Sequence, residues 1–571
     1  MKHVLSFLKP QKNKMLLGLC IKIAGTVAEL FLPVILTHIL ERVIEKQSAM
    51  HILFFGALMI LCAAFACAAN IIANRMAAKT SMLFSKELRS ALFQKTLALS
   101  AADVDRFTIP SLESRITTDT YNVHNFISMM QRMGVRAPIL FVGGMTVSFI
   151  LDARLALVML CTLPFIFVFV TMLSRKTTPL YRNVQASVDS MTRVVREDAQ
   201  GIRVIKALSK NDYENRRFAK ENERLSLAER KAGFVAAATH PTMTLIMNLG
   251  ITFVVLLSAY LVHGGKSSSA TVIAFLQYFT LISMAMMALS RMFVMYTKCA
   301  ASAGRIAKVL ATPDRLPQTE QTPKKDTAHI TFDGVSFSYF GKRNNLQNVS
   351  FSLSRGESLG IIGATGSGKS TLISLLLRFY DPTAGEVRIN GLPLPAYPKE
   401  TLSAMFGVAL QNDFLYADTI EENIRFGRPL SKEAVQKAAE IAQAHDFICE
   451  KDGGYDFVLS AKGTNLSGGQ KQRLLIARAI ADNPEILILD DASSALDYKT
   501  DAAVRKALKE HLPNTTTVVV AQRVSSVKDC NLILVLENGE VIGQGTHKEL
   551  LSDCLPYKEI SDSQMGGAFL D

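Results

Sequence analysis

Six stretches in the first half of the chain consist mainly of apolar residues and carry few charges. They lie near residues 15–40, 52–76, 133–151, 154–174, 242–263 and 270–294. Each comes close to the roughly 20 apolar residues that a helix needs to cross the hydrocarbon of a bilayer. The pattern predicts an all-α membrane domain with six transmembrane helices over residues 1–311, embedded in a lipid bilayer.

The links between these stretches alternate in length. Those at 41–51, 152–153 and 264–269 are short, whereas those at 77–132 and 175–241 are long and rich in Lys and Arg. Cytoplasmic loops of membrane proteins are enriched in these two residues, so we expect the long links and both chain termini on the cytoplasmic side of the plasma or inner membrane. Charged and apolar residues mix at helical period in the long links, which predicts spanning helices that extend beyond the bilayer.

Charged residues within a predicted span are costly and therefore informative. Lys22 and Glu29 lie seven residues apart in the first span, on one side of the helix. Three interpretations stay open: a polar patch that lines a substrate path, a structural ion pair inside the helix bundle, or a span boundary placed too early. Asn248, Gln277 and Tyr278 are further candidates for the lining of a cavity, although such side chains also form ordinary bonds between helices.

The second half of the chain has the pattern of a soluble α/β domain. Residues 312–327, TPDRLPQTEQTPKKDT, are rich in Pro, Thr and charge and predict a linker. The domain is expected over 328–571, with strands at Ile330–Tyr339 and Leu353–Ile362.

A phosphate-binding motif follows the second of these strands and precedes a predicted helix, Ser370–Tyr380. The sequence GATGSGKST fits GxxxxGK[ST], whose backbone N–H groups surround phosphate while Lys369 reaches the β- and γ-phosphates and Ser370 ligates Mg²⁺. Asp490 ends the apolar strand ILILD and is the expected second anchor for Mg²⁺. The candidate ATP-binding residues of the loop are Gly363, Thr365, Gly366, Ser367, Gly368, Lys369, Ser370 and Thr371.

The sequence Leu466-Ser467-Gly468-Gly469-Gln470 between these motifs makes the match specific. The chain resembles the ABC transporter family, and its layout is similar to the half-transporters of bacterial multidrug exporters. The resemblance implies that Tyr339 stacks on adenine and that Gln411 joins the Mg²⁺ shell. It also implies that Ser494–Asp497 connects two nucleotide-binding domains paired head to tail.

In that pairing each ATP lies between the phosphate loop of one chain and the LSGGQ motif of the other. Ser467, Gly468, Gly469 and Gln470 would therefore contact ATP at the partner's site. The resemblance also predicts cytoplasmic coupling turns near Phe107–Arg115 and Gly201–Ser209.

Two positions depart from the family pattern. Members that hydrolyse ATP efficiently have Glu after the strand-end Asp, and this chain has Asp491; the family's switch histidine is replaced by Gln522. Asp491 withdraws the catalytic carboxylate by about 1 Å, and misplacement of that size can cost on the order of 10²-fold in rate. We expect a site that binds ATP but hydrolyses it weakly, paired with a second half-transporter in a heterodimer. Drift in a homodimer is the alternative.

Composition limits the remaining classes of function. The net charge of +13 fits cytoplasmic membrane loops, and no basic run is interleaved with aromatics, so we expect no nucleic-acid partner. The eight cysteines show no metal-ligand spacing. The expected function is ATP-driven export of small amphipathic or apolar compounds. A lipid or peptide exporter and a nucleotide-sensing regulatory or channel subunit are the alternatives.

Overall fold

The computed structural model describes residues 2–43, 49–263, 268–313, 316, 318–319, 328–339, 341, 343–411 and 414–565. The predicted linker at 312–327 lies largely outside these residues, as do parts of the short links at 41–51 and 264–269. The chain forms two compact units. The first contains Met1–Leu97 and Ile109–Thr312, and the second contains Ala98–Thr108 and Pro313–Asp571.

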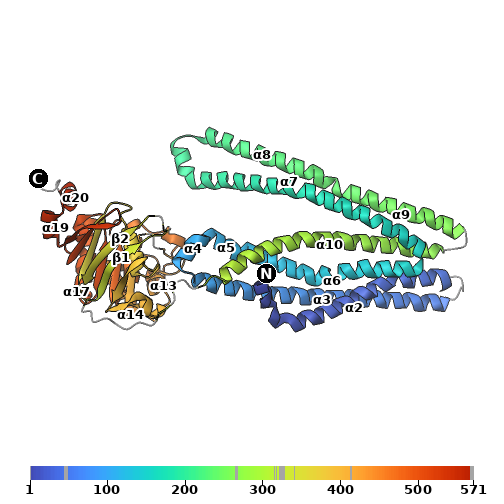
Figure 1. The fold of residues 1–571 in the computed structure, drawn as a ribbon, viewed down its shortest axis with the longest axis horizontal. Helices are drawn as coiled ribbons and strands as arrows, with labels where there is room; N and C mark the ends of the chain where they lie inside the picture. The colour runs from blue at the N-terminus through green and yellow to red at the C-terminus, as the bar shows by residue number, and fades with distance from the viewer. Residues whose placement is uncertain are drawn as a thin grey trace. The chain divides into compact units, whose positions relative to one another are not determined.

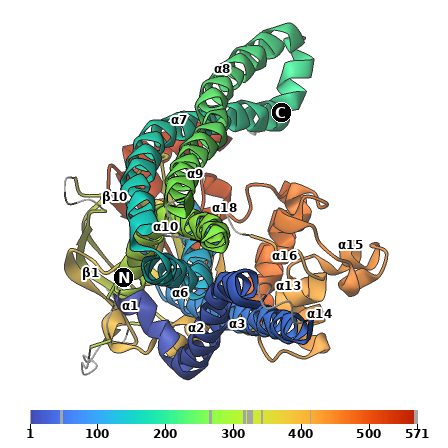
Figure 2. The ribbon, with the colours of Figure 1, turned by 90° about the vertical axis from the view of Figure 1, so that its right-hand side faces the viewer.

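The first unit is helical throughout its described residues (Figure 1). Helices α2, α3, α6 and α10 pack along one another, whereas α7, α8 and α9 form a long arm that diverges from them (Figures 1 and 2). The elements are α1 (Lys2–Leu5), η1 (Ser6–Gln11), α2 (Lys12–His38), η2 (Ile39–Val43), α3 (Ala49–Leu97), α5 (Ile109–Ser114), η3 (Arg115–Asp119), α6 (Thr120–Leu151), α7 (Ala153–Ala207), α8 (Asn211–Ala237), α9 (Thr239–His263) and α10 (Ser269–Leu310).

Five helical segments among the described residues are long and apolar enough to cross a membrane: His3–Glu41, Ala49–Leu97, Ile109–Leu151, Thr244–Leu261 and Ser269–Leu310. A shorter apolar stretch, Ala153–Thr162, opens α7 inside the predicted span 154–174. Helices α3, α7 and α10 have 49, 55 and 42 residues, more than the bilayer requires. The long links are therefore helical extensions, as the pattern predicted.

The charged residues of the first span have partners on neighbouring helices. Lys22 donates to Asn70 and Asn74 at 2.7 and 3.1 Å. The Glu29 carboxylate accepts from Arg136 of α6 through two bonds of 2.6 and 3.2 Å. Glu29 thus forms an ion pair within the bundle, with Arg136 as its partner.

Replacing Glu29 by Leu is expected to lower the thermal unfolding temperature more than replacing Glu29 and Arg136 by Leu together. The single change leaves an unpaired guanidinium in an apolar setting, whereas the double change removes both charges. Thermal unfolding of the unmodified chain, Glu29→Leu, Arg136→Leu and the double variant in one detergent measures the coupling. If the loss of unfolding temperature in the double variant equals the sum of the losses in the two single variants, the pair has no stabilising role.

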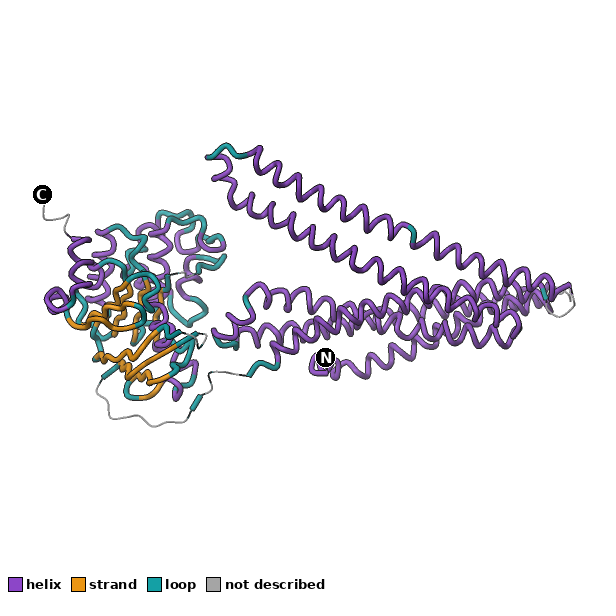
Figure 3. The backbone as a smooth tube through the Cα atoms, turned by 45° about the horizontal axis from the view of Figure 1, so that its top comes forward, coloured by secondary structure: helices purple, strands orange, loops and turns teal. Residues whose placement is uncertain are grey.

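The second unit contains all the strands found in the described residues, drawn in orange in Figure 3. One sheet is antiparallel with strand order β2-β1-β4-β5, and the other has the order β10-β9-β3-β8-β7-β6. In the second sheet β9, β3, β8, β7 and β6 are parallel, and only β10 runs antiparallel. Such a parallel sheet is covered by helices on both faces, and ligands bind at the carboxyl ends of its strands.

The strands are β1 (Ile330–Phe337), β2 (Leu346–Leu353), β3 (Ser358–Gly363), β4 (Ala384–Ile389), β5 (Leu392–Pro393), β6 (Phe406–Ala409), β7 (Ile486–Asp490), β8 (Thr516–Val520), β9 (Leu532–Glu537) and β10 (Glu540–Gly545). The helices are α4 (Ala101–Phe107), α11 (Lys369–Leu376), α12 (Lys399–Met405), α13 (Ile420–Arg425), α14 (Lys432–Ile441), α15 (His445–Cys449), α16 (Gly468–Ile480), α17 (Tyr498–His511), α18 (Val524–Val527), α19 (His547–Asp553) and α20 (Leu555–Met565), with single turns at η4 (Leu394–Ala396), η5 (Gly454–Asp456) and η6 (Ala461–Gly463).

Two boundaries predicted from the pattern are wrong. The expected strand Leu353–Ile362 is two strands, because a turn at Gly356 separates β2 from β3. Gly356 has a φ of +79°, and a Cβ there would lie 2.9 Å from the Pro513 carbonyl oxygen. The expected helix Ser370–Tyr380 ends at Leu376, since the backbone turns at Arg378 with a φ of 53°.

The two turns expected near Phe107–Arg115 and Gly201–Ser209 overlap those ranges only in part. The first one includes α4, bounded by Ser100, whose hydroxyl caps the helix, and by Thr108 with a φ of 63°. The second follows α7, where Ser209 adopts a φ of 51° before α8 begins. The first turn begins before its predicted range because α3 ends at Leu97, whereas the second lies at the end of its range because α7 continues to Ala207.

Candidate functional site

Four neighbouring parallel strands bring the predicted site residues together. The phosphate loop follows β3, Gln522 follows β8 by two residues, Asp490 ends β7, and Gln411 comes two residues after β6. Since β3, β8, β7 and β6 are adjacent and parallel, their carboxyl ends meet at one edge. A cavity of about 230 Å³ at this edge is lined by Asn345, Thr365, Gly366, Gly368, Lys369, Ser370, Thr371, Gln411, Asp490, Asp491, Val520, Ala521 and Gln522.

The phosphate loop has the backbone geometry that its glycines permit. Gly366 and Gly368 adopt φ values of +84° and +105°, and Gly368 is the N-cap of α11. A Cβ at Gly368 would lie 2.8 Å from the Asn345 carbonyl oxygen, so a larger residue would displace the loop. The start of α11 therefore presents free backbone N–H groups at the cavity, which suits an anion.

Lys369 and two carboxylates share the cavity. The Lys369 ammonium donates to the carbonyl oxygens of Gly363 and Ala364 at 2.7 and 2.8 Å. Burial lowers the Lys369 pKa, although the negative charges of Asp490 and Asp491 oppose that shift. Burial raises the pKa of Asp490, and the charge of Asp491 raises it further.

Asp491 lies beside Gln411 in the cavity. Gln411 Nε2 donates to Asp491 Oδ2 at 3.4 Å, and the Asp491 backbone N–H donates to the Val520 carbonyl at 2.9 Å. Burial raises the Asp491 pKa, opposed by the Gln411 hydrogen bond. Gln522 lines the same cavity. The two positions that depart from the family pattern are thus brought together with the complete phosphate loop.

Tyr339 lies in an aromatic cluster next to the loop. Its ring packs edge-on against Phe337 and Tyr380, with centroids 4.9 and 5.1 Å apart, and its hydroxyl donates to Thr371 Oγ1 at 3.4 Å. Tyr339 is 37% exposed. Asn345 belongs to none of the sequence motifs, yet it lines the cavity and supplies the carbonyl that Gly368 approaches.

The LSGGQ residues form the N-terminus of α16. Ser467 caps the helix by accepting from the Gln470 N–H, and Gln470 accepts in return from the Ser467 N–H at 3.1 Å. A Cβ at Gly469 would meet the Ala495 carbonyl at 3.2 Å, so this turn packs closely on the Ser494–Asp497 segment. None of these residues lines the 230 Å³ cavity of the same chain.

These residues fit a magnesium-bound nucleoside triphosphate. Ser367 is 4% exposed, and its Oγ has no hydrogen-bond partner among the described residues. The loop therefore contains a buried hydroxyl whose hydrogen-bonding capacity is unsatisfied. Lys369 and the N-terminus of α11 supply positive charge for the phosphates. Ser370, Gln411 and Asp490 line the cavity and could supply the oxygen ligands that Mg²⁺ prefers.

A helical membrane unit followed by an α/β unit with this loop at its strand ends is the architecture of an ATP-dependent membrane transporter. Residues 15–286 match the family of ABC transporter transmembrane regions, and residues 346–494 match the ABC transporter family of ATP-binding domains. The chain therefore belongs to the ABC transporter family and has a transmembrane and an ATP-binding domain.

Relatives that match this chain over nearly its whole length also belong to the ABC transporter family. The uncharacterized ABC transporter ATP-binding protein YfiB of Bacillus subtilis is 36% identical over 568 residues, which cover 99% of each chain. The uncharacterized ABC transporter ATP-binding protein Rv1273c of Mycobacterium tuberculosis is 32% identical over 98% of this chain and 97% of its own. The structure of a bacterial Atm1-family ABC exporter with ATP bound superposes with a TM-score of 0.79 at 23% identity, covering 98% of both chains. The fold is thus that of an ABC exporter.

Proposed function

We propose that this chain is one half of a heterodimeric ABC exporter and that its own Walker motifs form a degenerate ATP site. The observation that carries the proposal is the position of Asp491 and Gln522, which line the same cavity as an intact phosphate loop. The phosphate loop and the Mg²⁺ ligands Ser370, Gln411 and Asp490 favour binding of Mg-ATP. The shortened carboxylate of Asp491 positions the attacking water poorly, and Gln522 cannot carry the positive charge of a histidine.

The competent site lies, in this proposal, between the partner's phosphate loop and the LSGGQ residues of this chain. The capped N-terminus of α16, with Ser467 and the backbone N–H groups of Gly468 and Gly469, suits a phosphate group of that second ATP. A partner with Glu and His at the positions of Asp491 and Gln522 would complete it. ATP binding closes the two domains and turns the spans outward, and hydrolysis at the competent site resets them.

The contact that links ATP to the membrane helices is proposed to be the α4 turn. Residues 98–108, which connect α3 to α5, belong to the same compact unit as the ATP-binding domain. The Tyr380 hydroxyl donates to the Asp105 carboxylate at 2.5 Å, and the Tyr380 ring packs edge-on against Tyr339. A change at the nucleotide-facing ring can reach α4 through these two contacts.

Replacing Tyr380 by Phe is expected to leave ATP affinity unchanged within about twofold and to lower substrate-stimulated ATP turnover severalfold. The ring pair with Tyr339 stays, while the charge-assisted hydrogen bond to Asp105, which contributes roughly 1.5–3 kcal/mol, is lost. Both quantities are measured on the reconstituted transporter. Phe379→Leu is the matched control, since the Phe379 side chain is 43% exposed. Unchanged stimulation in Tyr380→Phe would contradict coupling through this contact.

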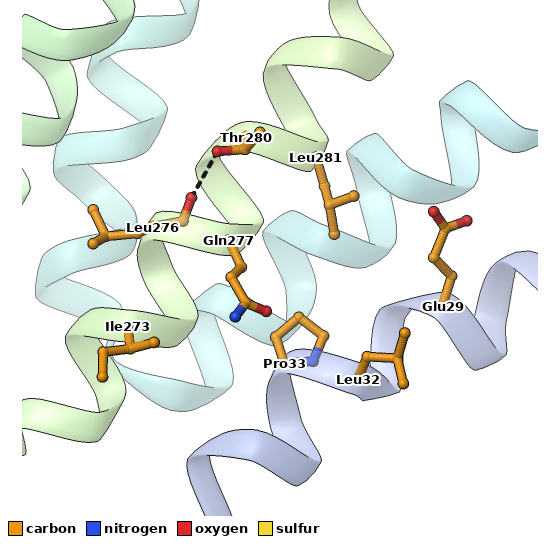
Figure 4. Close-up of a pocket in the computed structure, with 8 residues that line it drawn as sticks. All are labelled: Glu29, Leu32, Pro33, Ile273, Leu276, Gln277, Thr280 and Leu281. Carbon is orange, nitrogen blue, oxygen red and sulfur yellow. Dashed lines mark hydrogen bonds between the residues drawn. The ribbon is translucent and has the colours of Figure 1, made fainter. Parts of the chain in front are cut away.

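The membrane unit offers a cavity that suits an amphipathic substrate. It has a volume of about 520 Å³ and lies between α2 and α10 (Figure 4), lined by Glu29, Leu32, Pro33, Ile273, Leu276, Gln277, Thr280 and Leu281. Gln277 points toward Pro33 (Figure 4). Pro33 has no N–H, so the carbonyl of Glu29, four residues earlier in α2, does not receive the helix hydrogen bond from position 33. Polar groups at one part of a mostly apolar lining favour a ligand with an apolar body and a polar end.

Transport into inside-out vesicles that contain this chain and its partner tests the substrate class. We expect ATP-dependent uptake of small amphipathic compounds, reduced by Gln277→Leu. Uptake of lipids or peptides, but not of amphipathic compounds, would favour a lipid or peptide exporter. Nucleotide binding without uptake of amphipathic compounds, lipids or peptides would favour a regulatory or channel subunit.

A further inference from the structure

The segment that carries Gln522 packs against α20 (Leu555–Met565), the last helix among the described residues. Helix α20 places Tyr557, which is fully buried, in a hydrophobic cluster with Ile362, Ala521 and Val524. The Tyr557 hydroxyl bonds with His547 at 2.7 Å, which fixes the ring at the start of α20. The cluster therefore joins the end of β3, the end of β8 and α20.

Gln564 lies two helical turns after Tyr557 and reaches the same segment. Its Nε2 donates to the Gln522 carbonyl at 2.9 Å, and its Oε1 accepts from the Val524 N–H at 2.8 Å. One side-chain amide thus holds the backbone on both sides of Arg523. The Val524 N–H is at the start of α18, where no donor has a partner within the helix.

Gln522 and Arg523, whose backbone Gln564 holds, each contact a segment with a proposed function. The Gln522 side chain lines the ATP cavity, and the Arg523 guanidinium lies over the Tyr498 ring at 5.0 Å. Tyr498 directly follows Ser494–Asp497, which packs against the LSGGQ turn. A shift of the backbone at 522–524 would move both side chains.

We propose that Gln564 is a positioning residue that holds the 522–524 backbone and thereby sets where Gln522 lies in the ATP cavity. It acts through the backbone and does not line the cavity. The ATP-affinity part of this inference rests on the proposed ATP site, whereas the backbone contact does not.

Hydrogen exchange of the full-length chain tests the backbone contact. Gln564→Ala removes both bonds, so the Val524 amide is expected to exchange about tenfold faster, as loss of one hydrogen bond of about 1.4 kcal/mol predicts. Gln564→Glu keeps an acceptor for Val524 and loses the donor to Gln522, so exchange at Val524 stays near that of the unmodified chain. Ser563→Ala is the control on the exposed neighbour. Unchanged exchange in Gln564→Ala would overturn the proposal.

Mg-ATP affinity tests the consequence for the site. Gln564→Ala is expected to weaken binding threefold to tenfold in the full-length chain and less than twofold when Gln522 is already Ala, because the effect passes through Gln522. Equal weakening in both backgrounds, or a lowered unfolding temperature with unchanged affinity, would reject the positioning role. Absence of ATP binding in the unmodified chain would instead reject the proposed ATP site. Hydrogen exchange at Val524 would still decide whether Gln564 holds the 522–524 backbone.

Discussion

Replacing Asp491 by Glu and Gln522 by His together is expected to raise the ATP turnover of this chain on the order of 10²-fold. The longer side chain returns the carboxylate to a position that can orient the attacking water, and the imidazole restores a group that can carry positive charge. The proposed ATP-binding residues are left unchanged, since Gly366, Gly368, Lys369 and Asp490 already line one cavity. Turnover with Mg-ATP is measured on the purified fraction that elutes as a dimer.

Two controls make this gain interpretable. Adding Lys369→Ala to the restored chain is expected to abolish the gain, which excludes a contaminating ATPase. Either single restoration is expected to recover only part of the rate, because the two groups face one reaction centre. A doubly restored chain that binds ATP and turns over no faster than the unmodified chain would show that these two positions do not limit hydrolysis.

Loss of the Ser467 hydroxyl is expected to lower ATP turnover of the assembled two-chain transporter about tenfold or more. Ser467 caps α16, and in the proposed pairing its hydroxyl also faces the ATP that is hydrolysed. Ser467→Ala removes both roles. Asp491→Asn in the same chain is expected to change turnover less than twofold, since the site proposed to be degenerate would contribute little to the rate.

Ser431→Ala provides the matched control for the lost cap. Ser431 caps α14 by accepting from Ala434 N–H, much as Ser467 accepts from Gln470 N–H, so each change is expected to cost about 1 kcal/mol of stability. Only Ser467→Ala should lower turnover. Equal losses in the two variants would indicate that the effect is a loss of folding stability, and a large loss in Asp491→Asn would place hydrolysis at this chain's own site.

The pattern of the sequence predicted the architecture because its signals are strong and local. Apolar stretches of bilayer length, and GATGSGKST placed between a strand and a helix, each have a direct physical meaning. The parallel strands then bring Gln411, Asp490, Asp491 and Gln522 to one edge, which the separate motifs could not show by themselves. The boundary errors near Gly356 and Arg378 arose where a single residue of positive φ ends an element.

Contacts between distant residues could not be predicted from the pattern. The pattern left open whether Glu29 lines a substrate path or belongs to a structural ion pair, and it did not indicate the partner, Arg136, 107 residues away. The bonds between Tyr380 and Asp105 and between Gln564 and the 522–524 backbone join segments separated by 275 and about 40 residues. No periodicity in one chain encodes such partners, because the packing of whole elements brings them together.

The most direct test of the proposed degenerate site is ATP turnover of the purified chain alone, compared with the same chain assembled with a partner half-transporter that carries Glu and His at the two divergent positions. We expect the chain alone to bind Mg-ATP and hydrolyse it slowly, and the pair to hydrolyse it on the order of 10²-fold faster. Equally fast turnover by the chain alone and by the pair would contradict a degenerate site in this chain.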